Sequence, residues 1–199
     1  MSTFDFTKSA IVLLDCLEGV AAGQFGQGQP EDRAQFVDSL TELLDTAERA
    51  QIPVIRVDVQ FRAGHPEVSP TNAYFSAAKA AGRLVEGTEP TEPLAELQDR
   101  LDAFPRAIKR RIGGFAGSDL PQLLAGVECN GIILGGLITR GAVLSTATEA
   151  ADRDYRVAVL TDCSYDPDPE VHEVLTSKVL PIRAELLTVS DIDAACVRS

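Results

Sequence analysis

Three groups with the potential for acid–base or electrostatic chemistry each stand beside a short apolar run of the sequence. Asp15 follows the run AIVLL, and Lys109 ends the run AIK. The run IIL leads into a glycine-containing turn over residues 135–141, where a helical pattern begins. A carboxyl group can transfer a proton, an ammonium stabilises negative charge, and N–H groups at the start of a helix bind anions. We therefore treat these groups as candidates for one site.

The elements that must bring them together are predicted by periodicity. Residues 131–162 contain an apolar run, a glycine turn, small and apolar residues at helical spacing, and a second apolar run. This order indicates a strand, a helix and a strand. Strands that alternate with helices predict an α/β fold with a parallel sheet and helices on both faces. Right-handed crossovers then place the carboxyl ends of the strands at one edge, so we expect Asp15, Lys109 and the turn to converge there.

The rest of the chain continues this alternation. Residues 19–30 are rich in Gly and Gln and predict a loop, residues 60–92 predict an irregular connection that forms a lid or an oligomer contact, and the residues after 189 predict a tail. Ser118 is a predicted helix N-cap. The remaining strands are predicted at residues 10–14, 54–59, 107–109 and 186–189, and the helices at 30–47, 73–80, 92–101, 118–124 and 167–179.

Composition narrows the class of protein. The 199 residues are 45% hydrophobic, which suits one domain spanning residues 1–199 with a sizeable core. A net charge of −12 argues against binding to nucleic acid or to an anionic membrane. No apolar run approaches the roughly 20 residues of a membrane-spanning helix, and the first residues lack a signal pattern. Four cysteines without paired spacing predict reduced thiols, and we expect a cytoplasmic protein.

The motifs AIVLLD, IKRRIGGFAGSDL and GGLITRGAVLSTATEAADRDYRVAVLTD, in this order and spacing, resemble the isochorismatase-like hydrolase superfamily. The resemblance covers most of the chain. It implies a three-layer Rossmann-like fold with a six-stranded parallel sheet, a homodimer or homotetramer, no cofactor, and a small-molecule substrate. In the amidase branch it implies catalysis by Asp, Lys and Cys, an oxyanion hole of backbone N–H groups, here of Ile138 and Ala142, and a cis peptide between Leu137 and Ile138.

The family pattern G-x-x-T-x-x-C-V reads GLITRGAV at residues 136–143, so Ala142 stands where the amidases have cysteine. Alanine cannot attack a carbonyl carbon. Cys16 follows Asp15 on a strand and should face away from it, while Cys163 could approach the rim of the site. Isochorismatases resemble this chain in keeping Asp and Lys with a small residue at the cysteine position, and they hydrolyse a vinyl ether.

Three functions stay open at this point. The first is a cysteine-free hydrolase of a small, carboxylated molecule, with Asp15 as acid/base and Lys109 as electrostatic partner. The second is a catalytically silent relative that binds a small molecule or a protein partner. The third is a Cys-dependent amidohydrolase whose nucleophile has been replaced by Ala142.

Other residues are expected to bind substrate. Phe115 follows Lys109 closely and is the best aromatic candidate for the pocket wall. Arg62 can pair with a carboxylate, although a solvent-exposed position suits it equally. Arg140 either lines the crevice or reaches a neighbouring subunit, and Thr139 and Gly141 complete the turn. Nicotinamidases of the family bind a metal through Asp-x-His and a further His, whereas this chain reads Asp58-Val59-Gln60 with a lone His65, so no metal site is expected.

Overall fold

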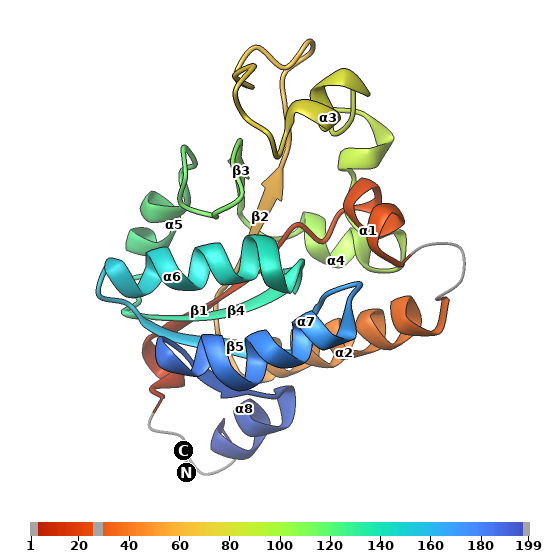
Figure 1. The fold of residues 1–199 in the computed structure, drawn as a ribbon. Coiled ribbons are helices and arrows are strands. Elements are labelled where there is room, and N and C mark those ends of the chain that lie inside the picture. The colour runs from red at the N-terminus through yellow and green to blue at the C-terminus, as the bar shows by residue number, and fades with distance from the viewer. Residues whose placement is uncertain (1–3, 26–29, 197–199) are drawn as a thin grey trace.

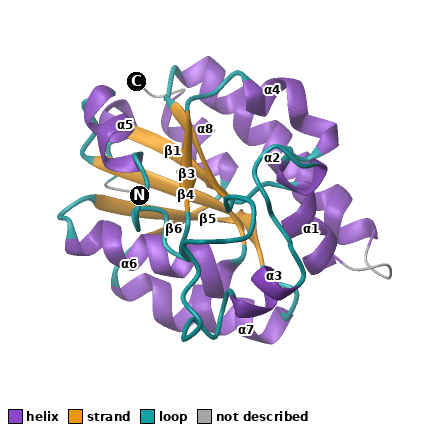
Figure 2. Cartoon of the chain, turned by 90° about the horizontal axis from the view of Figure 1, so that it is seen from above, coloured by secondary structure: helices purple, strands orange, loops and turns teal. Residues whose placement is uncertain are grey.

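The structure, a computed structural model, describes residues 4–25 and 30–196. A six-stranded, all-parallel sheet in the order β3-β2-β1-β4-β5-β6 runs through the described chain and confirms the predicted fold class (Figure 2). Its strands are β1 (Ser9–Leu14), β2 (Val54–Val59), β3 (Arg106–Lys109), β4 (Gly131–Leu137), β5 (Arg156–Tyr165) and β6 (Glu185–Leu187).

The three central strands carry apolar side chains on both faces because helices cover both sides. All residues of β1, β2 and β4 are buried. Their register aligns the carboxyl ends: Leu14 lies opposite Val57 of β2 and Gly136 of β4, and Val59 lies opposite Lys109. The sheet therefore ends at one level beside Asp15, as the parallel topology predicted.

Helices form the two outer layers. Ile11 and Leu13 of β1 pack with the α2 and α8 side, and Val12 and Leu14 pack with the α5 and α6 side. Within the described residues, no helix is long and apolar enough to span a membrane. The helices are α1 (Glu18–Phe25), α2 (Pro30–Ala50), α3 (Ser76–Ala80), α4 (Gln98–Asp102), α5 (Leu120–Gly126), α6 (Leu144–Asp152), α7 (Pro169–Val174) and α8 (Val189–Cys196).

Two predictions about local structure were wrong. Residues 18–25 form helix α1 rather than a loop, while residues 26–29 of the predicted loop lie outside the described residues. Glycine disfavours a helix interior, but a Cβ at Gly19 would lie 2.6 Å from Pro90, so close packing there favours glycine. The predicted tail contains α8, because Thr188 donates to Asp191 at the helix start and Ile192 is buried.

Smaller differences concern helix ends. Asp119, not Ser118, is the residue before α5, although the Ser118 hydroxyl accepts a hydrogen bond from the Leu120 N–H at 3.3 Å. The helices predicted at residues 73–80 and 92–101 are shorter, as α3 and α4 show. The hydrogen bonds that end a helix are only weakly indicated by the sequence. The predicted helices are therefore present, but their ends differ from the predicted residues.

The segment from residue 60 to residue 92 lies over the carboxyl edge of its own chain's sheet, above the ends of β2 and β3 (Figure 1). It has its own small apolar cluster, which is continuous with the strand ends. This arrangement favours the lid interpretation of the segment. The cluster consists of Leu17, Val59, Phe61, Val68, Phe75 and Leu84.

Candidate active site

Asp15 and Lys109 form a buried ion pair where β1 and β3 end. The Lys109 Nζ lies 2.7 Å from the Asp15 Oδ2, and their side chains are 1% and 8% exposed, respectively. The other carboxylate oxygen accepts the Val59 N–H at 2.8 Å, and Lys109 Nζ also donates to the Ile112 carbonyl at 2.7 Å. The pair is therefore fixed by groups from three neighbouring strand ends.

The backbone of Asp15 directs its carboxyl group into this position. Its φ of 54° lies in the left-handed region, which Asp tolerates better than most residues. The Asp15 N–H still donates to Val57 at 2.9 Å, so the residue belongs to the strand on one side and to the turn on the other. The sharp turn lets Asp15 face the crevice while Cys16 enters the opposite core.

Burial and the neighbouring charges shift the pKa of Asp15 in opposite directions. Burial raises the pKa of the Asp15 carboxyl above its ordinary value, while the Lys109 ammonium and the Val59 N–H act in the other direction. A carboxyl group with a raised pKa holds its proton more readily, and a proton held at a buried site can be transferred to a substrate. The arrangement thus suits proton transfer.

The glycine turn after β4 completes the site. Gly136 has a φ of 124°, and a Cβ there would lie 2.1 Å from the Leu14 carbonyl oxygen, so only glycine fits. The peptide bond between Leu137 and Ile138 is cis, as the resemblance implies. Residues Thr139–Val143 then form one wide helical turn that continues into α6.

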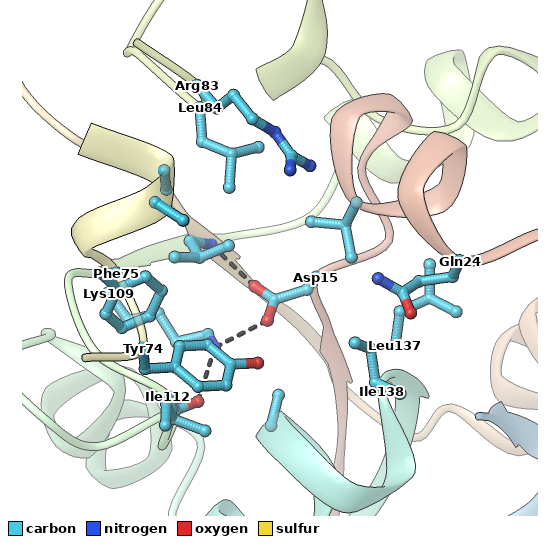
Figure 3. A pocket seen from close by; sticks show the side chains of 15 residues that line it. Asp15, Gln24, Tyr74, Phe75, Arg83, Leu84, Lys109, Ile112, Leu137 and Ile138 are labelled. Atoms are coloured by element: carbon cyan, nitrogen blue, oxygen red, sulfur yellow. Dashed lines mark hydrogen bonds and ion pairs between the residues drawn. The ribbon is translucent and has the colours of Figure 1, made fainter. Parts of the chain in front are cut away.

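A cavity of about 200 Å³ opens beside these groups (Figure 3). Its lining combines the ion pair, the turn and the lid segment, and, of the described residues, those that line it include no cysteine. The lining residues are Asp15, Val20, Gln24, Val59, Tyr74, Phe75, Ala77, Ala78, Arg83, Leu84, Lys109, Ile112, Leu137, Ile138 and Ala142.

The structure brings four of the residues singled out from the sequence to this cavity: Asp15, Lys109, Ile138 and Ala142. Gly141 lies nearby, since a Cβ built on it would be 3.5 Å from the Tyr74 hydroxyl. These residues come from strand ends or from the turn.

Thr139 and Arg140 fix the turn from outside the cavity. Thr139 is buried and its hydroxyl shares a 2.9 Å hydrogen bond with His172 Nδ1. Arg140 donates from its backbone N–H at 3.0 Å and from its guanidinium to the buried carboxylate of Asp166. Burial alone would raise the pKa of Asp166, but its hydrogen bonds from Arg140 and Asp168 leave that pKa below the ordinary value. These contacts assign the two side chains to support of the turn.

Two further predicted residues do not line the cavity. Phe115 is buried on the α5–α6 side, where its ring stacks on Tyr155 and lies 4.7 Å beneath the Arg153 guanidinium. Arg62 is exposed on the lid segment and pairs with Glu67 at 3.5 Å. Proximity in sequence to Lys109 misled the expectation for Phe115, because the chain turns away after the strand end.

The cysteines closest to the site in sequence are buried elsewhere. Cys16 and Cys163 both belong to the core on the α2–α8 side, and Cys163 donates to the Ser39 carbonyl at 3.5 Å. Cys163, which could have approached the rim, does not do so, and Cys16 faces away from Asp15 as predicted. Burial raises the pKa of both thiols, which disfavours the reactive thiolate.

Two polar residues that line the cavity were not predicted from the sequence as site residues. Gln24 lies in the stretch predicted as loop, and Arg83 lies in the irregular segment. Both side chains point toward the cavity in Figure 3. Tyr74 and Phe75 also line the cavity. The sole available signal was the unusual length of the connection between β2 and β3.

No group of three or more His, Cys, Asp or Glu side chains suited to a metal occurs in the part of the chain that the structure describes. His65 is buried, stacks on Phe61, and bonds through Nε2 to the Arg83 carbonyl at 2.8 Å. Asp58 is buried beside Arg56, whose Nε lies 3.0 Å from its carboxylate.

Comparison with known proteins identifies the family of this chain. The model of the isochorismatase domain matches residues 9–191. An uncharacterised isochorismatase family protein of Bacillus subtilis is 27% identical over 178 residues, which cover 89% of this chain and 88% of that protein.

Solved structures share the fold. A cysteine hydrolase from Pseudomonas syringae superposes with a TM-score of 0.84 at 17% identity, covering all of this chain and 96% of that one. An isochorismatase-like hydrolase from Alkaliphilus metalliredigens superposes with a TM-score of 0.74 at 24% identity, covering 94% of this chain and 98% of that one. Since the family model spans nearly the whole chain, this protein belongs to the isochorismatase family of hydrolases, whose members are typically enzymes.

Proposed function

We propose that this protein hydrolyses a small, carboxylated molecule without a cysteine nucleophile, using Asp15 as the acid/base. The observation that carries the proposal is the buried Lys109–Asp15 pair, 2.7 Å between Nζ and Oδ2, at the wall of an open cavity. A silent binding protein needs no such pair, and its burial costs free energy that substrate binding alone does not require.

The hydrogen bonds suggest how the work is divided. An ammonium has three donors, and Lys109 uses one on Asp15 and one on the Ile112 carbonyl. One donor is left for the substrate. Asp15 accepts one hydrogen bond on each oxygen from the protein and has further lone pairs. Lys109 thus acts as electrostatic partner, and Asp15 exchanges the proton.

Vinyl-ether hydrolysis of the isochorismate type is the best-defined reaction for this arrangement. Asp15 in its acid form protonates the enol-ether carbon, and an oxocarbenium ion results. Water adds to that ion and returns a proton to Asp15, and the hemiketal collapses to pyruvate and an alcohol. Burial favours the acid form that the first step needs. The amides of Ile138 and Ala142, both at the cavity wall, would hold a carboxylate of the substrate.

The test is pyruvate release from isochorismate by the native chain and by Asp15→Asn. Asp45→Asn is the matched control, because Asp45 is an exposed carboxylate paired with Arg100 away from the cavity. We expect Asp15→Asn to lose at least about 100-fold in rate, in line with the usual worth of an acid catalyst, and Asp45→Asn to retain full rate. No release by the native chain would remove isochorismate hydrolysis, and equal rates in all three would remove Asp15 as its acid.

A cysteine amidohydrolase with a replaced nucleophile is favoured by one observation. Ala142 lines the same cavity as Asp15 and Lys109, in a fold shared with a cysteine hydrolase. A thiol at this position would face a carboxyl group that can take its proton. Ala142→Cys should then release ammonia from small primary amides when the native chain does not, with Ala142→Ser as a control of equal size. If Ala142→Cys releases no ammonia from amides, this alternative is contradicted.

Assembly into a homodimer or homotetramer remains a prediction from the family. The mass of the protein in solution, measured by light scattering, tests it directly.

A further inference from the structure

One cationic side chain at the cavity wall takes no part in the ion pair described above. Arg83 lines the cavity from the lid segment, and its guanidinium is directed toward the space above Asp15 (Figure 3). Its Nη2 donates to the Gly19 carbonyl of α1 at 3.3 Å. Among the described residues, no carboxylate lies within ion-pair distance of Arg83, so its charge is uncompensated within that part of the chain.

The backbone that carries Arg83 is held firmly although the side chain is exposed. The Arg83 N–H donates to Ala78 at 2.9 Å, and its carbonyl accepts from the buried His65 ring at 2.8 Å. The next residue, Leu84, is buried and its carbonyl accepts the Phe61 N–H at 2.8 Å. The guanidinium therefore starts from a fixed point and is free to adjust only through its own side chain.

The charges around the cavity indicate that Arg83 is suited to bind an anionic group. Lys109 is 1% exposed and already donates to Asp15 and to the Ile112 carbonyl, both at 2.7 Å, so its ammonium serves the reacting carboxyl group. Of the described residues, Arg83 is then the cationic side chain at the cavity left to meet the rest of a ligand. The whole chain carries −12, which repels anions at long range. An anionic substrate thus needs a local positive group, and a guanidinium matches a carboxylate with two parallel hydrogen bonds.

We propose that Arg83 binds a carboxylate of the substrate, other than the one assigned to the Ile138 and Ala142 amides, and thereby selects carboxylates over neutral molecules of the same shape. The proposal deepens the proposed function and rests on it for the place of the reacting group. Figure 3 places Asp15 between Arg83 and Ile138 of the turn. A substrate anchored at Arg83 then presents its reacting group to Asp15, and the Gln24 amide lies at the same wall as a further hydrogen-bonding group.

Binding of benzoate and benzamide tests the proposal without any turnover. The two molecules have nearly the same shape and differ in charge. Isothermal titration calorimetry would give both affinities for the native chain, for Arg83→Met and for Arg62→Met. Arg62 is the matched control, because it is an arginine of the same segment that is exposed, pairs with Glu67 and lies off the cavity.

We expect the native chain and Arg62→Met to prefer benzoate by about tenfold or more, and Arg83→Met to lose that preference while benzamide binds unchanged. A native chain that binds benzamide as well as benzoate would overturn the proposal. So would an Arg83→Met variant that keeps the preference, or an Arg62→Met variant that loses it. Unchanged thermal unfolding of the variants would show that the fold persists.

The outcome is separable from that of isochorismate hydrolysis. If pyruvate release fails while the preference for benzoate depends on Arg83, the carboxylate site stands and the reaction assigned to Asp15 falls. If hydrolysis succeeds and the preference is independent of Arg83, the reaction stands and the carboxylate is bound elsewhere.

Discussion

Replacing Lys109 with methionine should destabilise the protein in a way that depends on pH. Methionine matches the length of the lysine stem but leaves Asp15, 8% exposed, without its counter-ion. At 2.7 Å and an effective dielectric constant of about 20, the lost attraction is about 6 kcal/mol, and the desolvation of lysine that is no longer needed offsets part of it. We therefore expect a net loss of about 3 to 5 kcal/mol in the free energy of unfolding at pH 8.

The pH dependence follows from the pKa of Asp15. Burial already raises this pKa, and removal of the ammonium that lowers it raises it further. Between the unfolded and folded pKa values, the folded variant then binds more protons than the unfolded chain. Its unfolding free energy falls as pH rises, by up to about 1.4 kcal/mol per pH unit. At pH 5.5 a larger share of Asp15 carries a proton than at pH 8, so the penalty should be smaller there.

Urea denaturation at pH 5.5 and pH 8 measures this directly, with each variant compared with the native chain at the same pH. The double variant Asp15→Asn with Lys109→Met removes both charges, so it should recover most of the stability lost at pH 8. The Ile112 carbonyl loses its donor in both variants, and that cost cancels between them. A penalty that is equal at both pH values, or a double variant as unstable as the single one, would refute the reasoning.

Three further predictions concern the supports of the site. Burial raises the pKa of Asp58 to about 7, so the contribution of Asp58 to the unfolding free energy should fall by up to about 4 kcal/mol as pH rises from 4 to 7, and urea titrations of the native chain and of Asp58→Asn should differ by this pH-dependent amount. Gly136→Ala, whose Cβ would meet the Leu14 carbonyl oxygen at 2.1 Å, should cost about 4 kcal/mol or more, seen as a lower urea midpoint or as insoluble protein. Asp166→Asn removes the anion that holds Arg140 and should cost about 1 to 2 kcal/mol of stability, with a raised KM for an anionic substrate in steady-state assays.

Each of these has a result that would contradict it. A slope unchanged by Asp58→Asn would mean that this carboxyl does not titrate near neutrality. Native stability in Gly136→Ala would mean that the turn can open to admit a methyl group. An Asp166→Asn variant with native KM would mean that the Ile138–Ala142 turn holds its shape without Arg140.

The strands and the Asp15–Lys109 ion pair were predictable because a parallel sheet ties them to simple patterns. A continuous apolar run marks a strand buried on both faces, and a polar residue at its end marks the carboxyl edge. Asp15 and Lys109 both fit this pattern, and the aligned register of β1, β2 and β3 brings them within 2.7 Å. Topology alone was sufficient to predict their convergence.

The helices α1 and α8 show where local patterns fail. Gly19 and Gly23 lower the helix propensity of α1, yet contacts with Pro90 and with the Arg83 side chain hold the segment in place. Long-range contacts of this kind leave no periodic trace in the sequence. Residues 18–25, which border the cavity, are therefore helical although their helix propensity is low.

The residues that line the cavity opposite the glycine turn could not be predicted from the sequence, because they are also placed by long-range contacts. Arg83 reaches the cavity because His65 bonds to its carbonyl, and because the next residue, Leu84, adopts a φ of 57° and accepts the Phe61 N–H. None of these features has a spacing that a sequence pattern reveals. In the proposed function, the strand ends supply groups for the reaction, whereas the segment of residues 60–92 supplies groups that meet the rest of the substrate. Substitutions in the lid should therefore alter which molecule binds while leaving the Asp15–Lys109 pair unchanged.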